Sequence, residues 1–156
     1  MKTARSTIGG RRRRYRALSP PERRLFRAAW WALLVSDLEL RFAERRSLEA
    51  AMAPPAPAPS RTARPPAPAA AGELQKVAQA VASAAANHLW PMNCLPRSLA
   101  LKRLLAKRGI ASTFRIGVRK DFGELQAHAW IEVDGVPLGE PEAIEARFLP
   151  LGREGP

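Results

Sequence analysis

The sequence predicts an α+β domain in the second half of the chain, preceded by a helical segment and a proline-rich linker. Two helical patterns of apolar residues open that half, and residues that alternate between apolar and polar types follow them. Helices followed by a short antiparallel sheet are typical of α+β proteins. The 156 residues suffice for about one domain.

Composition divides the chain into four segments. Residues 1–17 are expected to form a basic disordered arm, and residues 18–52 an amphipathic helical segment. Residues 53–72 are rich in proline and alanine. Proline lacks an amide donor and disfavours helix in the residue before it, so this segment is expected to be an extended linker. Residues 73–156 form the predicted compact domain.

The first helix is expected to begin after Ser19 and to run over residues 21–51. Ser19 is a good helix cap, proline follows in the first turn, and Glu22 favours the positive end of the helix. Apolar residues recur at near-helical spacing and make one broad face. This face is expected to pack against the C-terminal domain, with a groove on a partner protein as the alternative.

The compact domain is expected to contain two helices and an antiparallel sheet. The first helix ends near His88, and the second begins at Cys94 and ends before Gly109, a residue that suits a helix C-terminus. The apolar-polar alternation predicts strands, and an Asp-Gly pair predicts a turn between the last two of them. The expected strands are residues 113–119, 127–133 and 136–138.

The net charge of +12 is concentrated at the N-terminus. Residues 1–46 hold 13 basic and 4 acidic side chains, whereas residues 73–156 are close to neutral with 11 and 9. The Arg11–Arg14 run would attract phosphates or an acidic peptide alike. A solvated basic tail and a docking element for a partner both fit it. Nucleic acid is not expected as a partner, because no aromatic stacking surface accompanies the arginines.

Several classes of protein are excluded by residue counts. One cysteine permits no internal disulfide, which favours a reducing, cytoplasmic setting. With two histidines and one cysteine, no metal site is expected. No glycine loop for phosphate binding is present, so no cofactor is expected. The longest apolar run, Ala28–Val35, is too short to span a membrane and is followed by the charged residues 37–41 rather than a signal cleavage site.

The single cysteine, Cys94, is the candidate nucleophile. A lone cysteine is most often buried and inert. Its place at a helix start, with Pro96 in the first turn, changes that interpretation, because exposed amides and the helix dipole there stabilise a thiolate. The oxyanion of an acyl transfer would be met by the Cys94 amide and a second donor among residues 90–93.

His128 is the candidate partner of the thiol. A thiolate nucleophile needs an imidazole to hold the ion pair and to protonate the leaving amine. His88 lies only six residues before the cysteine, at a helix end, which leaves His128 in the strand over residues 127–133. Its same-face neighbours Trp130 and Glu132 fit a cleft wall or a solvated surface.

Glu140 is the candidate acid that would orient the imidazole. An ideal two-residue turn at Asp134–Gly135 puts Glu140 on the face away from His128. A three-residue connection with a bulge shifts the register by one and puts it on the same face. Glu132 and Asp134 are the alternatives for this role.

Four segments resemble the leader peptidases of lasso-peptide biosynthesis, which are transglutaminase-like cysteine proteases. The likeness covers roughly residues 73–141, and the amphipathic segment before the linker also resembles the N-terminal portion of that family. The segments are NCLPRSLAL at 93–101, KRGI at 107–110, RIGV at 115–118 and AHAWIE at 127–132.

The resemblance implies a transglutaminase-like, papain-like core with an N-terminal helical arm. Cys94 matches the family's nucleophile and His128 its base. The family's acid is usually aspartate, and Glu140 stands at the corresponding position. With no room for a β-rich recognition domain before residue 73, the chain resembles the stand-alone peptidase of a split pair.

The same resemblance implies a function and three partners. The peptidase would remove the leader of a ribosomal precursor peptide, and a separate cyclase would then close the macrolactam. The expected partners are the precursor's leader, a separate leader-recognition protein and that cyclase. Two alternatives stay open: a transglutaminase-like acyltransferase, and a nonenzymatic basic module that binds peptide or RNA and has a buried cysteine.

Overall fold

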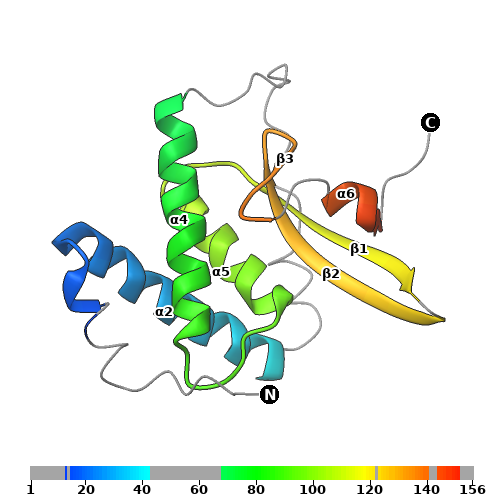
Figure 1. The fold of residues 1–156 in the computed structure, drawn as a ribbon, viewed down its shortest axis with the longest axis horizontal. Coiled ribbons are helices and arrows are strands. Elements are labelled where there is room, and N and C mark those ends of the chain that lie inside the picture. The colour runs from blue at the N-terminus through cyan, green and yellow to red at the C-terminus, as the bar shows by residue number, and fades with distance from the viewer. Residues whose placement is uncertain (1–12, 14, 43–67, 122, 141–143, 152–156) are drawn as a thin grey trace.

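The computed structural model describes residue 13 and residues 15–42, 68–121, 123–140 and 144–151. The three long helices group on one side of a small antiparallel sheet, and the β1–β2 hairpin extends away from them (Figure 1). The predicted α+β class is confirmed. In chain order the elements are α2 (Pro20–Phe42), α4 (Pro68–Ala86), α5 (Cys94–Ala106), β1 (Thr113–Asp121), β2 (Glu124–Val133), β3 (Val136–Pro137), α6 (Ile144–Arg147) and β4 (Leu149–Pro150).

The start of α2 follows the expected capping pattern. The Glu22 carboxylate accepts hydrogen bonds from the Ser19 amide at 2.7 Å and from the Ser19 hydroxyl at 2.6 Å. Both bonds lower the pKa of Glu22, because they favour the charged carboxylate, and the bond from the Ser19 hydroxyl has the larger effect. Residues 15–17 are helical although they fall in the segment predicted to be disordered, and the Tyr15 ring packs edge-on against Phe26.

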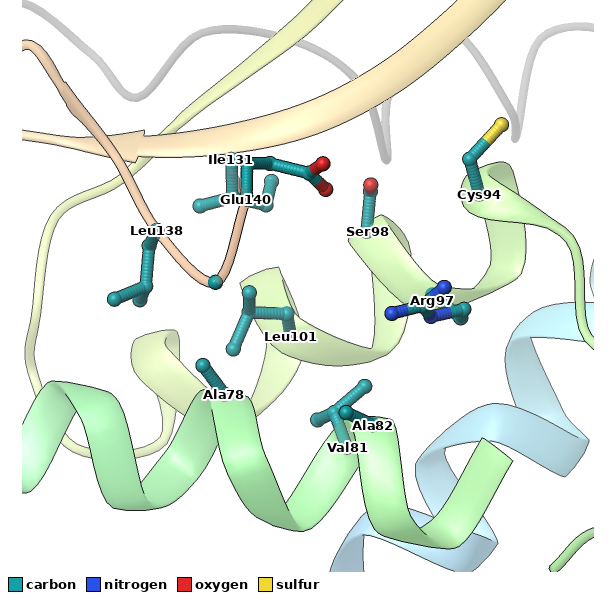
Figure 2. Close-up of a pocket in the computed structure, with 11 residues that line it drawn as sticks. Ala78, Val81, Ala82, Cys94, Arg97, Ser98, Leu101, Ile131, Leu138 and Glu140 are labelled. Atoms are coloured by element: carbon teal, nitrogen blue, oxygen red, sulfur yellow. The ribbon is translucent and has the colours of Figure 1, made fainter. Parts of the chain in front are cut away.

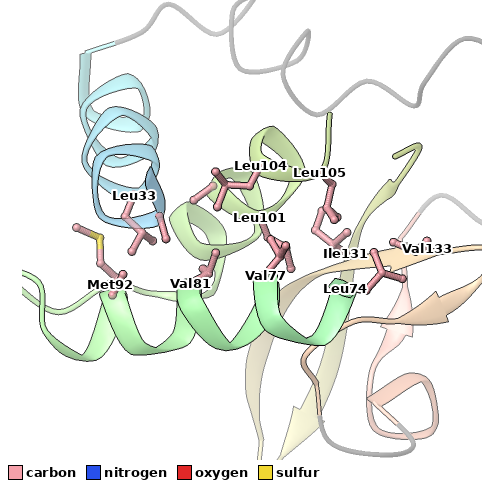
Figure 3. Close-up of a cluster of buried hydrophobic side chains, with 13 residues drawn as sticks. Leu33, Leu74, Val77, Val81, Met92, Leu101, Leu104, Leu105, Ile131 and Val133 are labelled. Atoms are coloured by element: carbon pink, nitrogen blue, oxygen red, sulfur yellow. The ribbon is translucent and has the colours of Figure 1, made fainter. Parts of the chain in front are cut away.

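Helix α2 belongs to the main hydrophobic core. Its buried face carries Ala29 and Leu33, and the helix packs against α4 and α5 in a core cluster that also includes residues of β2 (Figure 3). The structure therefore agrees with the expected packing of this helix on the C-terminal domain, not with the partner groove. The predicted end of the helix, up to residue 51, lies outside the described residues. The buried core consists of Ala29, Leu33, Leu74, Val77, Val81, Ala84, Met92, Ala100, Leu101, Leu104, Leu105, Ile131 and Val133.

Truncating Leu33 is expected to destabilise the whole domain. The side chain is fully buried, so Leu33→Ala removes core contacts and leaves a cavity, which costs about 2–5 kcal/mol of unfolding free energy. Leu38→Ala on the same helix is the control, because that side chain is exposed. Urea unfolding measures both variants. Equal effects would contradict the assignment of α2 to the core.

Helices α4 and α5 have boundaries that the sequence predicts in part. Helix α4 begins at Pro68, inside the segment predicted to be linker, since proline is tolerated in a first helical turn. Helix α5 begins at Cys94, as expected. It is followed by Gly109 at a φ of +70°, and the Ile110 amide donates to the Leu105 carbonyl at 3.1 Å, which closes the helix end.

The sheet has the strand order β3-β2-β1-β4, with antiparallel neighbours throughout. Alternate residues of β2 face two different clusters. Ile131 and Val133 join the helical core, whereas Trp130 packs with Ile144 and Phe148. No pattern in the sequence predicted α6 and β4, the elements on either side of Phe148 in this second cluster.

Across the described residues, no helix combines the length and the apolar character that a membrane crossing requires.

Candidate functional site

Cys94 is the first residue of α5 and is half-buried. The preceding Asn93 has an extended backbone, and its side chain does not cap the helix. Pro96 has no amide proton, and the Arg97 amide already donates to the Asn93 carbonyl. The amides of Cys94 and Leu95 are therefore left without helical partners beside the thiol, as the first amides of a helix are.

The loop that delivers the chain to Cys94 is held by α2. The Trp90 indole Nε1 donates to Asp37 Oδ2 at 3.0 Å, and Arg41 Nε donates to the same oxygen at 2.7 Å. The ring of His88 stacks on Trp30, with ring centroids 4.6 Å apart. These contacts attach the segment that precedes Cys94 to α2.

His88 is buried and is not suited to partner the thiol. Its ring lies between Trp30 and Trp90, and neither ring nitrogen has a hydrogen-bond partner. Burial lowers the pKa of His88 below its usual value of 6.5, and the nearby Asp37 charge opposes this shift without cancelling it. The imidazole is therefore neutral in the folded protein at neutral pH.

The free energy of unfolding is expected to fall as the pH drops below about 6.5, the unfolded pKa of histidine. The folded pKa of His88 is lower than the unfolded one, so the unfolded state binds the proton first. Urea unfolding between pH 8 and pH 5 measures the slope, and His88→Phe should flatten it. An equal slope in the variant would assign the pH dependence to other groups.

His128 and Glu140 are brought together by the structure. His128 Nε2 and Glu140 Oε2 are 3.0 Å apart, and both side chains are about four-fifths buried, with 23% and 19% exposed. The imidazole also packs beside the rings of Phe148 and Trp130, with centroids 5.3 and 6.3 Å away. The aromatic pair and the carboxylate together restrict the orientation of the imidazole.

Glu140 reaches His128 by a route that differs from the expected bulge. The Asp134–Gly135 turn has two residues at positive φ, and its register persists to Leu138, whose amide donates to the Ile131 carbonyl at 2.8 Å. No register shift occurs. Instead the chain leaves the ladder at Gly139, at a φ of +74°, and this redirects Glu140 toward His128.

Gly139 also marks a close approach between this loop and α4. A Cβ atom at Gly139 would lie 3.0 Å from the Cβ of Ala78. Glycine satisfies both the left-handed backbone and the short separation, so the position of Glu140 depends on it.

The other two candidate acids lie elsewhere. Glu132 accepts hydrogen bonds from Trp130 Nε1 and Arg115 Nε, both at 3.0 Å. Asp134 is an exposed turn residue. Among the three candidates, Glu140 is the one that the structure pairs with His128.

Cys94 and Glu140 line one cavity between α4, α5 and the loop after β3. Figure 2 shows Ser98 between them, with the Glu140 carboxylate directed toward Ser98. The buried Ser98 hydroxyl donates to the Ala129 carbonyl at 2.8 Å and so joins α5 to β2 next to His128. Sequence reasoning missed Ser98, although it lies one helical turn after Cys94, on the same helix face.

Within the described part of the chain, no hydrogen bond joins the Cys94 thiol to His128. The structure pairs His128 with Glu140, and Glu140 shares a cavity with Cys94. The arrangement offers a thiol beside free helix amides and an imidazole held by a carboxylate. Such groups can perform nucleophilic acyl transfer.

The described residues contain no cluster of three histidine, cysteine, aspartate or glutamate side chains placed to hold a metal ion.

Comparison with known proteins gives a family for this chain. No curated protein and no solved structure matches it. The Transglutaminase-like superfamily matches residues 34–153, a segment that begins within α2 and includes Cys94, His128 and Glu140. Members of this superfamily are typically cysteine-dependent enzymes and include cysteine proteases and acyltransferases. With well over half of its length matched, the chain belongs to the Transglutaminase-like superfamily.

Proposed function

We propose that the chain is a cysteine peptidase that removes the leader from a ribosomally made lasso precursor peptide. The observation that carries this proposal is the 3.0 Å contact between His128 and Glu140, at the edge of a cavity that Glu140 shares with Cys94. Superfamily membership supports cysteine-dependent chemistry. The resemblance of residues 93–101 and 127–132 to lasso leader peptidases supplies the substrate class.

In the proposed mechanism, the Cys94 thiolate attacks the carbonyl carbon of the scissile peptide bond. The oxyanion forms beside the free amides at the start of α5. His128 gives its proton to the departing amine, the carbon–nitrogen bond breaks, and the leader remains as a thioester on Cys94. Water then attacks the carbonyl carbon of the thioester and gives a proton to His128, the carbon–sulfur bond breaks, and the leader leaves with a free carboxyl group while Cys94 is regenerated. Glu140 holds the imidazole and stabilises its charged form throughout.

An acyltransferase is the second candidate, because the superfamily includes such enzymes. The first half of the mechanism is identical, and an amine replaces water in the second half. The third candidate, a nonenzymatic binding module, requires a buried and inert cysteine. Cys94 is half-buried and lines a cavity, which favours a reactive thiol.

Cleavage of the cognate precursor tests the proposal directly. The precursor is incubated with recognition protein and with wild type or Cys94→Ala, and mass spectrometry reports the products. Wild type should release leader and core, and the variant should release neither. An added primary amine separates the candidates, since an acyltransferase would couple the leader's new C-terminus to it. Equal cleavage by both proteins would contradict the peptidase.

The proposed partners are the precursor's leader, a separate leader-recognition protein and the lasso cyclase. Helix α2 offers a docking surface for the recognition protein, because it exposes apolar residues at helical spacing on the side away from the core. This exposed row consists of Trp31, Val35, Leu38 and Phe42. The basic arm up to residue 12 lies outside the described residues.

Point substitutions test this docking better than deletion, since deleting residues 1–50 would remove Ala29 and Leu33 from the core. Trp31→Ser and Phe42→Ser should weaken binding of the recognition protein while the alkylation rate of Cys94 stays constant. Unchanged binding in both variants would eliminate the exposed row as the docking surface.

A further inference from the structure

Arg97 lies between two hollows of the molecular surface. It lines the cavity that holds Cys94 and Glu140, and it also lines a second, larger hollow beside the segment that precedes Cys94. Arg97 is three residues after Cys94 in α5, and residues at this spacing are neighbours on one helix face. Figure 2 shows its guanidinium on the thiol side of the first cavity.

The guanidinium of Arg97 has no partner among the residues that the structure describes. Each of the other half-buried arginines in the described residues bonds to a protein oxygen: Arg23 to the Leu18 carbonyl, Arg103 to Glu39, Arg115 to Glu132 and Arg119 to Gln126. Arg97, equally half-buried, makes no hydrogen bond or ion pair with any described residue. Partial burial of an unpaired charge is costly, and its natural complement is an anion.

Apart from Arg97 and His88, the residues that line the second hollow have apolar side chains, and about half of its exposed surface is polar. None of the described residues that line it is acidic, and the rest of its wall comes from α4 and from the segment before Cys94. Leu89 is 73% exposed there. The imidazole of His88, also part of the wall, has no hydrogen-bond partner at either nitrogen. The apolar lining residues are Ala82, Ala85, Ala86, Leu89, Trp90, Pro91 and Met92.

We infer that Arg97 binds a carboxylate of the peptide substrate next to the scissile bond, while an adjacent apolar side chain enters the second hollow. A guanidinium matches a carboxylate through two parallel hydrogen bonds, and the apolar side chains of the second hollow can pack against an apolar neighbour. Arg97 is then a specificity-determining residue beside the thiol. This inference rests on the proposed peptidase function.

Alkylation of Cys94 tests the electrostatic part without any peptide substrate. Cys94 is the chain's single cysteine, so mass spectrometry counts its adducts without ambiguity. Iodoacetate is negatively charged and iodoacetamide is neutral. The alkylation rate with iodoacetate divided by the rate with iodoacetamide should fall about three- to tenfold in Arg97→Gln, because this variant no longer attracts the anionic reagent. High salt should lower the wild-type ratio toward that of the variant.

Lys107→Gln is the matched control for alkylation. It removes one positive charge from the exposed far end of α5, about 20 Å along the helix from Cys94, and it should leave the rate ratio unchanged. A ratio that does not change in Arg97→Gln, or that falls equally in both variants, overturns the inference.

A peptide library tests the specificity part. Acetylated, amidated peptides vary one position at a time on both sides of the cleaved bond. Wild type should prefer aspartate or glutamate at one position, Arg97→Gln should lose this preference, and Arg97→Glu should favour lysine or arginine there. A second library with free C-termini separates an acidic side chain from a terminal carboxylate as the anion.

Cleavage without any acidic preference overturns the inference. If wild type cleaves no peptide and no precursor, the proposed function fails, and the alkylation ratio alone decides the role of Arg97.

Discussion

Replacing Glu140 by glutamine is expected to lower kcat for leader cleavage by roughly two to four orders of magnitude, with little change in KM. Glutamine keeps the size of the side chain but cannot stabilise the charged imidazole that forms when His128 accepts a proton. The pair is partly buried, so water does not replace the lost charge completely. Single-turnover cleavage of the precursor measures the rate, and circular dichroism verifies that the variant is folded.

Two other carboxylates supply the controls for this experiment. Asp134→Asn changes an exposed turn residue at positive φ, a conformation that asparagine tolerates, and it should leave kcat unchanged. Glu132→Gln should lower the free energy of unfolding, because it weakens the contacts to Arg115 and Trp130. Its rate per folded molecule should stay close to wild type. A larger loss of kcat in Glu132→Gln than in Glu140→Gln would mean that Glu132, and not Glu140, is the acid that orients His128.

Adding a side chain at Gly117 is expected to damage both stability and the site. Gly117 is the cross-strand partner of His128, and a Cβ there would lie 2.8 Å from the Trp130 ring and from the Phe148 Cβ. Trp130 is fully buried, so the ring cannot move without a wider rearrangement. Gly117→Ala should cost about 1–3 kcal/mol of unfolding free energy. Because Trp130 and Phe148 also flank His128, the rate of cleavage should fall as well.

Gly72→Ala is the matched control for the glycine experiment. This glycine lies in α4, with nothing within 4 Å of the added Cβ. Alanine in a helix is favoured over glycine by about 0.5–1 kcal/mol, so this variant should be slightly more stable than wild type. Thermal unfolding of both variants gives the comparison. A neutral Gly117→Ala would mean that the Trp130–Phe148 cluster is loosely packed.

The elements that the sequence predicted best are those with a local pattern. The α5 boundaries follow from Cys94, Pro96 and Gly109, whose conformational preferences act within one helical turn. The β1–β2 ladder follows from alternation, and the two-residue turn follows from Asp134–Gly135. Each of these predictions needed only neighbouring residues.

What the sequence did not predict depends on contacts between distant segments. The two-residue strand β4 and the four-residue α6 are too short to carry a periodic pattern, and they form where Phe148 packs beside Trp130. The Asp37–Trp90 hydrogen bond spans 53 positions of sequence. For Glu140, the sequence offered the residue as one of three candidate acids, and its contact with His128 depends on the turn at Gly139, which lies close to α4.

The outer half of the β1–β2 hairpin has consequences for the behaviour of the protein at high concentration. Strand β3 pairs with residues 132–133 and β4 with residues 117–118, and no other described strand pairs with β1 or β2 nearer the tip of the hairpin, so the two backbone edges there can accept a strand of another molecule. Charged and polar side chains occupy this part, where Arg119 bonds across to Gln126 and Lys120 is exposed. Leu125 is an exposed apolar residue among them. The charge of this hairpin therefore opposes edge-to-edge aggregation, and neutralising it would lower the concentration at which the protein precipitates.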